Sequence, residues 1–252
     1  MKKETPLLKK ETMDIILGSL LGDGSLAMNP GYKNARFSFR HSINQKEYFF
    51  WKMKMLEEIA GKSCYWLQGN EKKPDGWGTV KYRFQSKALP SLTELYRLTH
   101  KRVPGTKVKV TRKWLNRLSP LSLAIWWLDD GSLVSDSRQG VLCTDGFFLE
   151  EVRIIDRYFK KIWNIKTKIG RVDNMNRYRI WIRSTQELQK FLKIIIPCVF
   201  VKSMLYKILL IYKNSQLQQR WISEIARFGN FSEQEIIEAL KARISKRSQI
   251  KI

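Results

Sequence analysis

The sequence has little cysteine and little histidine for its length. Among 252 residues there are three cysteines, Cys64, Cys143 and Cys198, and two histidines, His41 and His100. Three widely separated cysteines predict no disulfide framework and fit a reducing compartment. A Cys/His zinc site has too few ligands, and no nucleophile elbow supports a Ser-His-Asp or Cys-His mechanism.

Long apolar runs are also missing. No run approaches the roughly 18 residues that a membrane span needs. The first twelve residues, M-K-K-E-T-P-L-L-K-K-E-T, are charged and mixed, without the apolar core or the cleavage site of a signal peptide. With 43% hydrophobic and 28% charged residues, the composition predicts a soluble globular protein. The length allows one large domain or two small ones.

Acidic residues are scarce relative to basic ones. Lysine and arginine number 47 against 23 aspartate and glutamate, which gives a formal net charge of +24. Such a balance predicts a polyanionic partner, and the usual one is nucleic acid. The basic residues are spread along the chain, which argues against a membrane-surface helix. A ribosome-associated or merely soluble basic protein is the alternative interpretation.

The chain contains an internal repeat. The segments I-L-G-S-L-L-G-D-G-S-L (16–26) and L-A-I-W-W-L-D-D-G-S-L (123–133) align without a gap, which superposes Asp23 on Asp130. The patterns that follow predict the same order in both halves: helix, strand, strand, helix, strand, strand, helix. The predicted parts are an N-terminal repeat (1–99), a basic connector (100–118), a C-terminal repeat (119–213) and a C-terminal extension (214–252). The extension has no counterpart, and it is either a helical addition or a basic arm on DNA.

Three predicted strands carry polar, mostly basic side chains at every second position. The alternation places each set on one face of a sheet. Arginine, glutamine and serine can read base edges, whereas a merely solvated face would favour lysine and glutamate. We therefore predict a nucleic-acid surface. Its residues are Arg36, Ser38, Arg40, Ser42, Thr79, Lys81, Arg83, Gln85, Arg177, Arg179 and Arg183, with Trp181 in the last strand.

The acids at the ends of the repeated segments suggest a metal site. Gly18 and Gly22 lie on one face of the first predicted helix and allow another backbone to approach, and Gly24 can end that helix after Asp23. A carboxylate is unfavourable at a helix C-terminus, and two brought together would repel each other. A divalent cation removes the conflict, because Mg²⁺ prefers carboxylate and carbonyl oxygens. Asp23 and Asp130 therefore predict metal-assisted phosphodiester hydrolysis, against the alternative of two ordinary helix-end residues.

The repeated segments resemble the paired motifs of LAGLIDADG homing endonucleases, and the whole chain is similar to the monomeric, intron-encoded branch. Nine positions are matched by I-L-G-S-L-L-G-D-G and by L-A-I-W-W-L-D-D-G, and the lead-in L-S-P-L-S strengthens the second match. The resemblance implies an α+β fold of two pseudo-symmetric αββαββα repeats. Their saddle-shaped antiparallel sheets would sit on DNA, with the motif helices at the interface.

The resemblance also implies which residues act. Lys101 and Lys207 match basic residues near the scissile phosphates, and each is catalytic, a plain phosphate contact or a surface lysine. Mg²⁺, for which Mn²⁺ can substitute, would be held by the carboxylates of Asp23 and Asp130 and the carbonyl groups of Gly22 and Asp129. The second motif departs from the pattern at Ile125 and Asp129, where the family has small or apolar residues. This departure predicts an interface that is glycine-rich on one side and bulky on the other.

The leading prediction is a site-specific, Mg²⁺-dependent endonuclease that cuts both strands of a long DNA target and leaves short 3′ overhangs. Such a protein would be a monomer that acts in intron homing, inside the cell where its host DNA lies, in a mitochondrion or chloroplast. One alternative is an RNA maturase that assists intron splicing, with intron RNA as its partner. The other is a DNA-binding regulator that does not cut. Two acids placed near phosphates argue against a pure binder.

Overall fold

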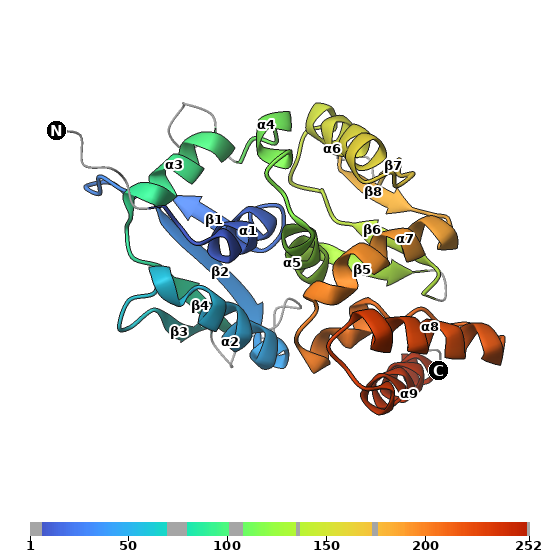
Figure 1. Cartoon of the computed structure of the whole chain (residues 1–252). Coiled ribbons are helices and arrows are strands. Elements are labelled where there is room, and N and C mark those ends of the chain that lie inside the picture. The colour runs from blue at the N-terminus through green and yellow to red at the C-terminus, as the bar shows by residue number, and fades with distance from the viewer. Residues whose placement is uncertain (1–6, 70–79, 101–107, 135–136, 173–175, 251–252) are drawn as a thin grey trace. The chain divides into compact units, whose positions relative to one another are not determined.

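The computed structural model describes residues 7–69, 80–100, 108–134, 137–172 and 176–250, the last five of these by their backbone only. The chain divides into two compact units, 1–129 and 130–252, which run from blue to green and from green to red in Figure 1. This division follows the packing of the chain and falls at the end of a helix. The repeat boundaries given above follow the sequence and stay a prediction.

The first unit begins with the predicted αββαββα order. A short helix in the connector and the second motif helix follow it, and the short 3₁₀ helices η1 (Ile43–Gln45) and η2 (Glu57–Ile59) flank α2. The main elements are α1 (Lys10–Ser19), β1 (Gly24–Ala27), β2 (Arg36–Ser42), α2 (Lys46–Met55), β3 (Tyr65–Gln68), β4 (Lys81–Gln85), α3 (Pro90–Thr99), α4 (Arg112–Leu115) and α5 (Pro120–Asp130).

The same order recurs from α5 onwards, which confirms the predicted repeat of the fold. In the described residues of the second unit the elements are β5 (Gly131–Val134), β6 (Gln139–Leu142), α6 (Leu149–Ile162), β7 (Lys168–Arg171), β8 (Tyr178–Ile182), α7 (Thr185–Ile195), η3 (Ile196–Cys198), η4 (Lys202–Lys207), α8 (Ser215–Phe228) and α9 (Glu233–Ile250). Across the described part of the chain, every helix is too short or too polar to cross a membrane.

Each unit contains one antiparallel four-stranded sheet with the same topology. The strand orders are β1-β2-β4-β3 and β5-β6-β8-β7. In the first sheet Phe39 lies opposite Phe84, and in the second Leu142 lies opposite Ile180; all four side chains are buried. These registers put the apolar residues of neighbouring strands on one face, as the period of two requires. The predicted α+β class is therefore confirmed.

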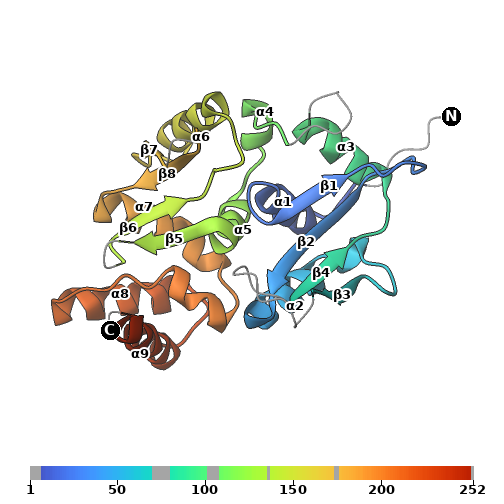
Figure 2. The ribbon, with the colours of Figure 1, turned by 180° about the vertical axis from the view of Figure 1, so that it is seen from behind.

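Helices cover the apolar face of each sheet. In the first unit, Phe49 of α2 packs against Phe39 of β2, with 5.2 Å between the centroids of the two tilted rings. In the second unit, Phe159 of α6 and Phe191 of α7 meet at 5.9 Å between ring centroids. Burial of such large aromatic side chains supplies most of the driving force for packing a helix on a sheet. Figures 1 and 2 show each sheet and its helices from two opposite sides.

The two motif helices pack closely, as the glycines of α1 predicted. A Cβ atom at Gly18 would lie 2.3 Å from the carbonyl oxygen of Ser122 in α5. The expectation that the first helix continues to Asp23 is wrong, because α1 ends at Ser19. The chain then tightens into turns, and the amide of Gly22 donates to the carbonyl oxygen of Ser19 at 2.9 Å. Gly24 does not terminate a helix but begins β1, packed against the backbone of Ser19.

The C-terminal extension is helical. Asn214 accepts a hydrogen bond from the amide of Leu217 at 2.9 Å and so begins α8. The indole of Trp221 donates to the carbonyl oxygen of Ile208 at 3.1 Å, which fastens α8 to the end of the second repeat. α8 and α9 lie side by side in both views, and the buried side chain of Ile236 anchors α9.

Candidate functional site

Asp23 ends the first motif at the surface of its unit. Its side chain is 40% exposed, so an ion and its waters can reach the carboxylate. The preceding Gly22 lies so close to α5 that a Cβ atom on it would be 2.6 Å from the Cβ of Asp129. A larger residue at position 22 would therefore push the Asp23 backbone away from α5.

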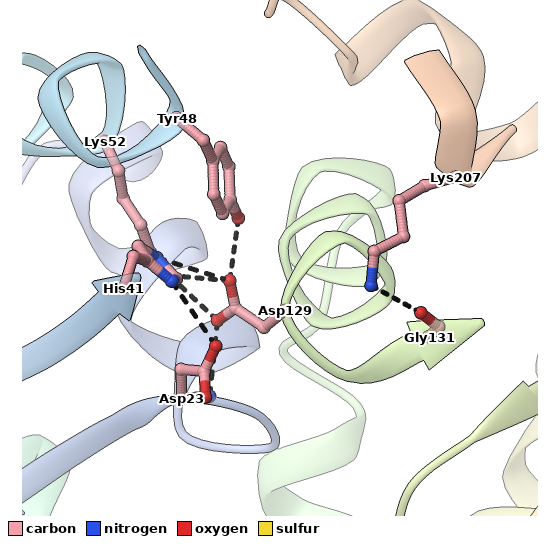
Figure 3. A network of polar contacts seen from close by, with 7 residues as sticks. All are labelled: Asp23, His41, Tyr48, Lys52, Asp129, Gly131 and Lys207. Carbon is pink, nitrogen blue, oxygen red and sulfur yellow. Dashed lines mark hydrogen bonds and ion pairs between the residues drawn. The ribbon is translucent and has the colours of Figure 1, made fainter. Parts of the chain in front are cut away.

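The carboxylate of Asp129 is the centre of a buried polar network (Figure 3). The ammonium of Lys52 donates to both of its oxygens, at 3.0 Å and 2.8 Å. The hydroxyl of Tyr48 donates to Oδ1 at 2.8 Å, and the backbone amide of Asp23 donates to Oδ2 at 3.4 Å. The side chains of Lys52 and Asp129 are both completely buried.

This network satisfies the Asp129 carboxylate without an added ion. An ionised carboxylate offers about four acceptor positions, and four hydrogen bonds occupy them here. Lys52 also supplies the compensating positive charge. The side chain of Asp129 thus has a cation already, and the side chain of Asp23 is the more exposed of the two acids.

His41 of β2 lies between the two acids. Its Nδ1 is 3.4 Å from Oδ2 of Asp23, and its Nε2 is 3.8 Å from Oδ1 of Asp129. The ring is buried, and among the described residues neither nitrogen makes a hydrogen bond of good geometry. One ligand atom from each of these three residues falls within 4.8 Å of the other two. The spacing would suit a metal ion, but the ammonium of Lys52 already occupies the Asp129 side of the cluster.

The second motif acid, Asp130, begins the second unit and is half-buried. Its carbonyl oxygen accepts a hydrogen bond from the amide of Cys143 at 3.2 Å, and burial raises the pKa of the Cys143 thiol. Lys207 of η4 is buried, and its ammonium donates to the carbonyl oxygen of Gly131, the residue after α5, at 2.6 Å (Figure 3). Lys101 lies outside the described residues.

The basic side chains of β2 and β4 share one face of the first sheet, as the alternation predicted. Arg40 lies opposite Arg83, Ser42 opposite Lys81, and Ser38 opposite Gln85, with Arg36 two residues before Ser38 on the same face. Thr79 lies outside the described residues. The face also carries an exposed tryptophan, Trp66 of β3, which lies opposite Arg83. The guanidinium carbon of Arg83 is 5.3 Å from the centroid of the Trp66 ring.

The corresponding face of the second sheet is more crowded. Arg179 donates two hydrogen bonds to the carboxylate of Asp145, at 2.8 Å and 2.6 Å. A Cβ atom at Gly170 would be 2.6 Å from Nε1 of Trp181, so the indole ring lies over the glycine. The guanidinium carbon of Arg183 is 5.4 Å from the centroid of the Trp181 ring. Arg177 lies just before β8 and is half-buried.

A family described as the LAGLIDADG DNA endonuclease family matches residues 13–191, which is more than half of the chain. The chain belongs to the LAGLIDADG DNA endonuclease family. The matched range begins within α1, contains α5, both sheets and the Asp129 network, and ends within α7. The residues beyond α7 therefore lie outside the part of the chain that matches the LAGLIDADG family.

Individual relatives differ in how much of the LAGLIDADG chain they match. Protein RecA of Mycobacterium shimoidei is 34% identical over 136 residues, which are 54% of this chain and 29% of that protein. The chain thus spans about three tenths of the length of the RecA proteins that it matches. The cytochrome b mRNA maturase bI2 of Debaryomyces hansenii is 27% identical over 203 residues, 80% of this chain and 74% of that protein.

A solved structure shares the LAGLIDADG fold. The homing endonuclease I-WcaI, bound to its DNA recognition sequence, superposes with a TM-score of 0.72 at 22% sequence identity. The superposition covers 84% of this chain and 91% of that one. At this level of identity the similarity establishes the fold but not the roles of individual residues in the site.

Reasoning from the sequence missed four residues of the site: His41, Tyr48, Lys52 and Trp66. A signal existed for two of them. Tyr48 and Lys52 stand four apart in the run K-E-Y-F-F-W-K-M-K-M and so share one side of α2. A lysine on an apolar helix face needs a buried partner, and the acid of the second motif that departs from the family pattern is that partner.

Proposed function

We propose that the protein is a site-specific endonuclease that hydrolyses both strands of a long double-stranded DNA target, with Mg²⁺ or Mn²⁺ as cofactor. The observation that carries the proposal is the exposed carboxylate of Asp23, which ends a matched motif while the neighbouring Asp129 is neutralised by Lys52. Membership of the LAGLIDADG DNA endonuclease family supports it.

The donors in the motifs fit a hard divalent cation. We propose as ligands the carboxylates of Asp23 and Asp130 and the carbonyl oxygens of Gly22 and Asp129, which are of the kind that Mg²⁺ prefers. The bound metal would supply an activated water and stabilise the leaving oxygen. Within the chain, Gly22 lets the Asp23 backbone approach Asp129, and the 40% exposure of the Asp23 side chain leaves it accessible.

The basic strand faces would hold the DNA. Three arginines, a lysine, a glutamine and two serines share one face of the first sheet, and such side chains contact phosphates and base edges. Lys101 and Lys207 would act near the scissile phosphates. The ammonium of Lys207 donates to the carbonyl oxygen of Gly131. Gly131 directly follows Asp130, which is a proposed metal ligand.

The remaining details of the activity belong to the same proposal. We propose a monomer that cuts both strands to leave short 3′ overhangs, acts in intron homing and works inside the cell, in a mitochondrion or chloroplast. An RNA maturase is the second candidate, because the maturase bI2 is similar over 80% of this chain. A regulator that binds DNA without cutting has less support, since both motif acids are present.

Cleavage selection on randomised DNA duplexes tests the proposal. The purified protein should cut a subset of sequences in Mg²⁺ or Mn²⁺, leave 3′ overhangs and stop when the metal is chelated. Tight DNA binding without cutting in either metal would favour the regulator. Binding to structured intron RNA with faster splicing, and no cleavage of DNA, would favour the maturase.

A further inference from the structure

The Lys52–Asp129 ion pair connects a helix outside the motifs with the end of the first motif. Asp129 uses one oxygen, Oδ2, both for the ammonium of Lys52 at 2.8 Å and for the backbone amide of Asp23 at 3.4 Å. Its other oxygen is held by Lys52 and Tyr48. Figure 3 shows these groups converging on the one carboxylate. A displacement of Lys52 would therefore move the Asp129 side chain and, through it, the Asp23 backbone.

The geometry of α2 makes this carboxylate rigid. Tyr48 and Lys52 lie four residues apart, so both project from the same side of the helix. The ammonium of Lys52 also lies 4.8 Å from the Phe39 ring centroid and 5.4 Å from the Tyr48 ring centroid, within the range of a cation–π contact. Because these rings pack in the core, the lysine has few alternative rotamers and holds Asp129 in one orientation.

The burial of the pair argues that it serves more than stability. Burying both charges carries a large desolvation cost, and a well-packed apolar pair of similar volume is often as stable or more stable. The side chains of Lys52 and Asp129 have no exposure at all. Beside an exposed acid such as Asp23, a second carboxylate without its own cation would compete for a divalent metal.

We propose that Lys52 is a positioning residue for the nuclease. Lys52 holds the Asp129 carboxylate against the Asp23 backbone. Because its ammonium hydrogen-bonds to both carboxylate oxygens, it also prevents this carboxylate from becoming a metal ligand. The metal is then left to the carboxylate of Asp23 and its partner ligands. This inference rests on the proposed endonuclease function for its kinetic consequences but not for its consequences for metal binding.

Mn²⁺ binding to the protein without DNA tests the inference directly. Lys52→Met keeps the volume of the side chain and removes its charge, so Asp129 should recruit a cation. We expect Mn²⁺ affinity, measured from the loss of free Mn²⁺ signal in electron paramagnetic resonance, to rise at least about tenfold. Adding Asp129→Asn to Lys52→Met should abolish the gain. Lys54→Met, an exposed lysine on the same helix, is the matched control and should bind as the parent does.

Kinetics provide the second readout. In Lys52→Met, at a temperature where the variant is folded, the Mg²⁺ concentration for half-maximal single-turnover cleavage should shift about tenfold. DNA affinity should stay within about threefold of the parent, since binding rests on phosphate contacts. A purely structural lysine would lower stability and leave this metal dependence unchanged.

Parental Mn²⁺ affinity together with parental metal dependence in folded Lys52→Met would overturn the inference. If that variant does not fold, the uncharged double variant, Lys52→Met with Asp129→Asn, is measured in its place. In this double variant the charge at position 129 is gone, so Mn²⁺ affinity should match that of the parent. Single-turnover cleavage at saturating Mg²⁺ should slow with DNA binding preserved, because the Asp23 backbone has lost its fixed partner, and parental cleavage contradicts the inference. If the parent protein cuts no duplex, the proposed function is wrong. The Mn²⁺ titration would still test the effect of Lys52 on metal binding.

Discussion

A Cβ atom at Gly18 would lie 2.3 Å from the carbonyl oxygen of Ser122, so only glycine lets the two motif helices meet at their observed distance. Such a contact is with backbone, which cannot rotate away as a flexible side chain can. The close approach also brings the end of α5 to the end of the first motif. The position of the Asp129 network therefore depends on a residue that has no side chain.

Gly18→Ala should consequently destabilise the protein, even though alanine favours helices. Overpacking a close backbone contact is expected to lower the free energy of unfolding by about 2 kcal/mol or more. Urea unfolding followed by circular dichroism measures the change. Gly61→Ala is the control, because a Cβ atom there meets only Lys87 Cγ at an ordinary 3.7 Å. Equal stability of the two variants would contradict the close packing.

Arg83→Gln should weaken DNA binding mainly by removing a phosphate contact. The guanidinium lies against Trp66, and its Nε has no hydrogen-bond partner among the described residues, so it can turn toward a ligand. We expect the slope of log Kd against log salt to fall by about one. Fluorescence anisotropy at several salt concentrations measures it. Lys54→Gln on α2 should leave the slope unchanged, and an unchanged slope in Arg83→Gln would remove this face from the DNA surface.

Asp14→Asn should change stability in a pH-dependent way. Burial raises the pKa of the Asp14 carboxyl above its usual value of 3.8, against the lowering effects of Ser119 and Lys10. The folded protein therefore binds this proton more tightly than the unfolded chain, and the stability it contributes is lost as pH rises through the folded pKa. The variant should gain stability relative to the parent as pH rises from below 3.8 toward neutrality. A difference that stays constant across this range in urea unfolding would contradict the assignment.

Lys207→Met should separate a catalytic lysine from a structural one. Loss of the hydrogen bond to the Gly131 carbonyl oxygen, which measures 2.6 Å, should cost about 1 to 3 kcal/mol of stability. If Lys207 acts on the scissile phosphate, single-turnover cleavage should also fall by about 100-fold or more at unchanged DNA affinity. Lys213→Met, an exposed lysine, serves as the control. Lower stability with full cleavage would make Lys207 only a support for the end of α5.

Periodicity and repetition were enough to predict the fold. The repeated segment predicted two copies of one unit, and the sheet orders β1-β2-β4-β3 and β5-β6-β8-β7 confirm it. The strand pattern also predicted that the polar side chains within each strand share a face, because alternation in a strand is a local property. That Arg40 lies opposite Arg83 comes from the register of the sheet. The end of α1 was missed, since Gly24 packs on the Ser19 backbone and forces the turn through a contact that helix-end patterns do not encode.

The candidate site was only partly predictable for a different reason. Asp23 and Asp130 stand out because the repeat superposes them. The pairing of Lys52 with Asp129 joins residues 77 positions apart, and no local pattern specifies such a partner. The resemblance to the family predicted a role in metal binding only for the Asp129 carbonyl group. The structure adds that the side chain of this residue accepts four hydrogen bonds.

We propose that Asp23 and Asp130 hold the catalytic metal, and the sharpest test is single-turnover cleavage by Asp23→Asn and by Asp130→Asn. Each substitution keeps the shape of the side chain and removes the charge that the metal needs. On a duplex that the parent cuts in Mg²⁺, both variants should lose cutting by about 1,000-fold or more while retaining DNA affinity. Cutting that survives both substitutions would show that neither carboxylate holds the catalytic metal.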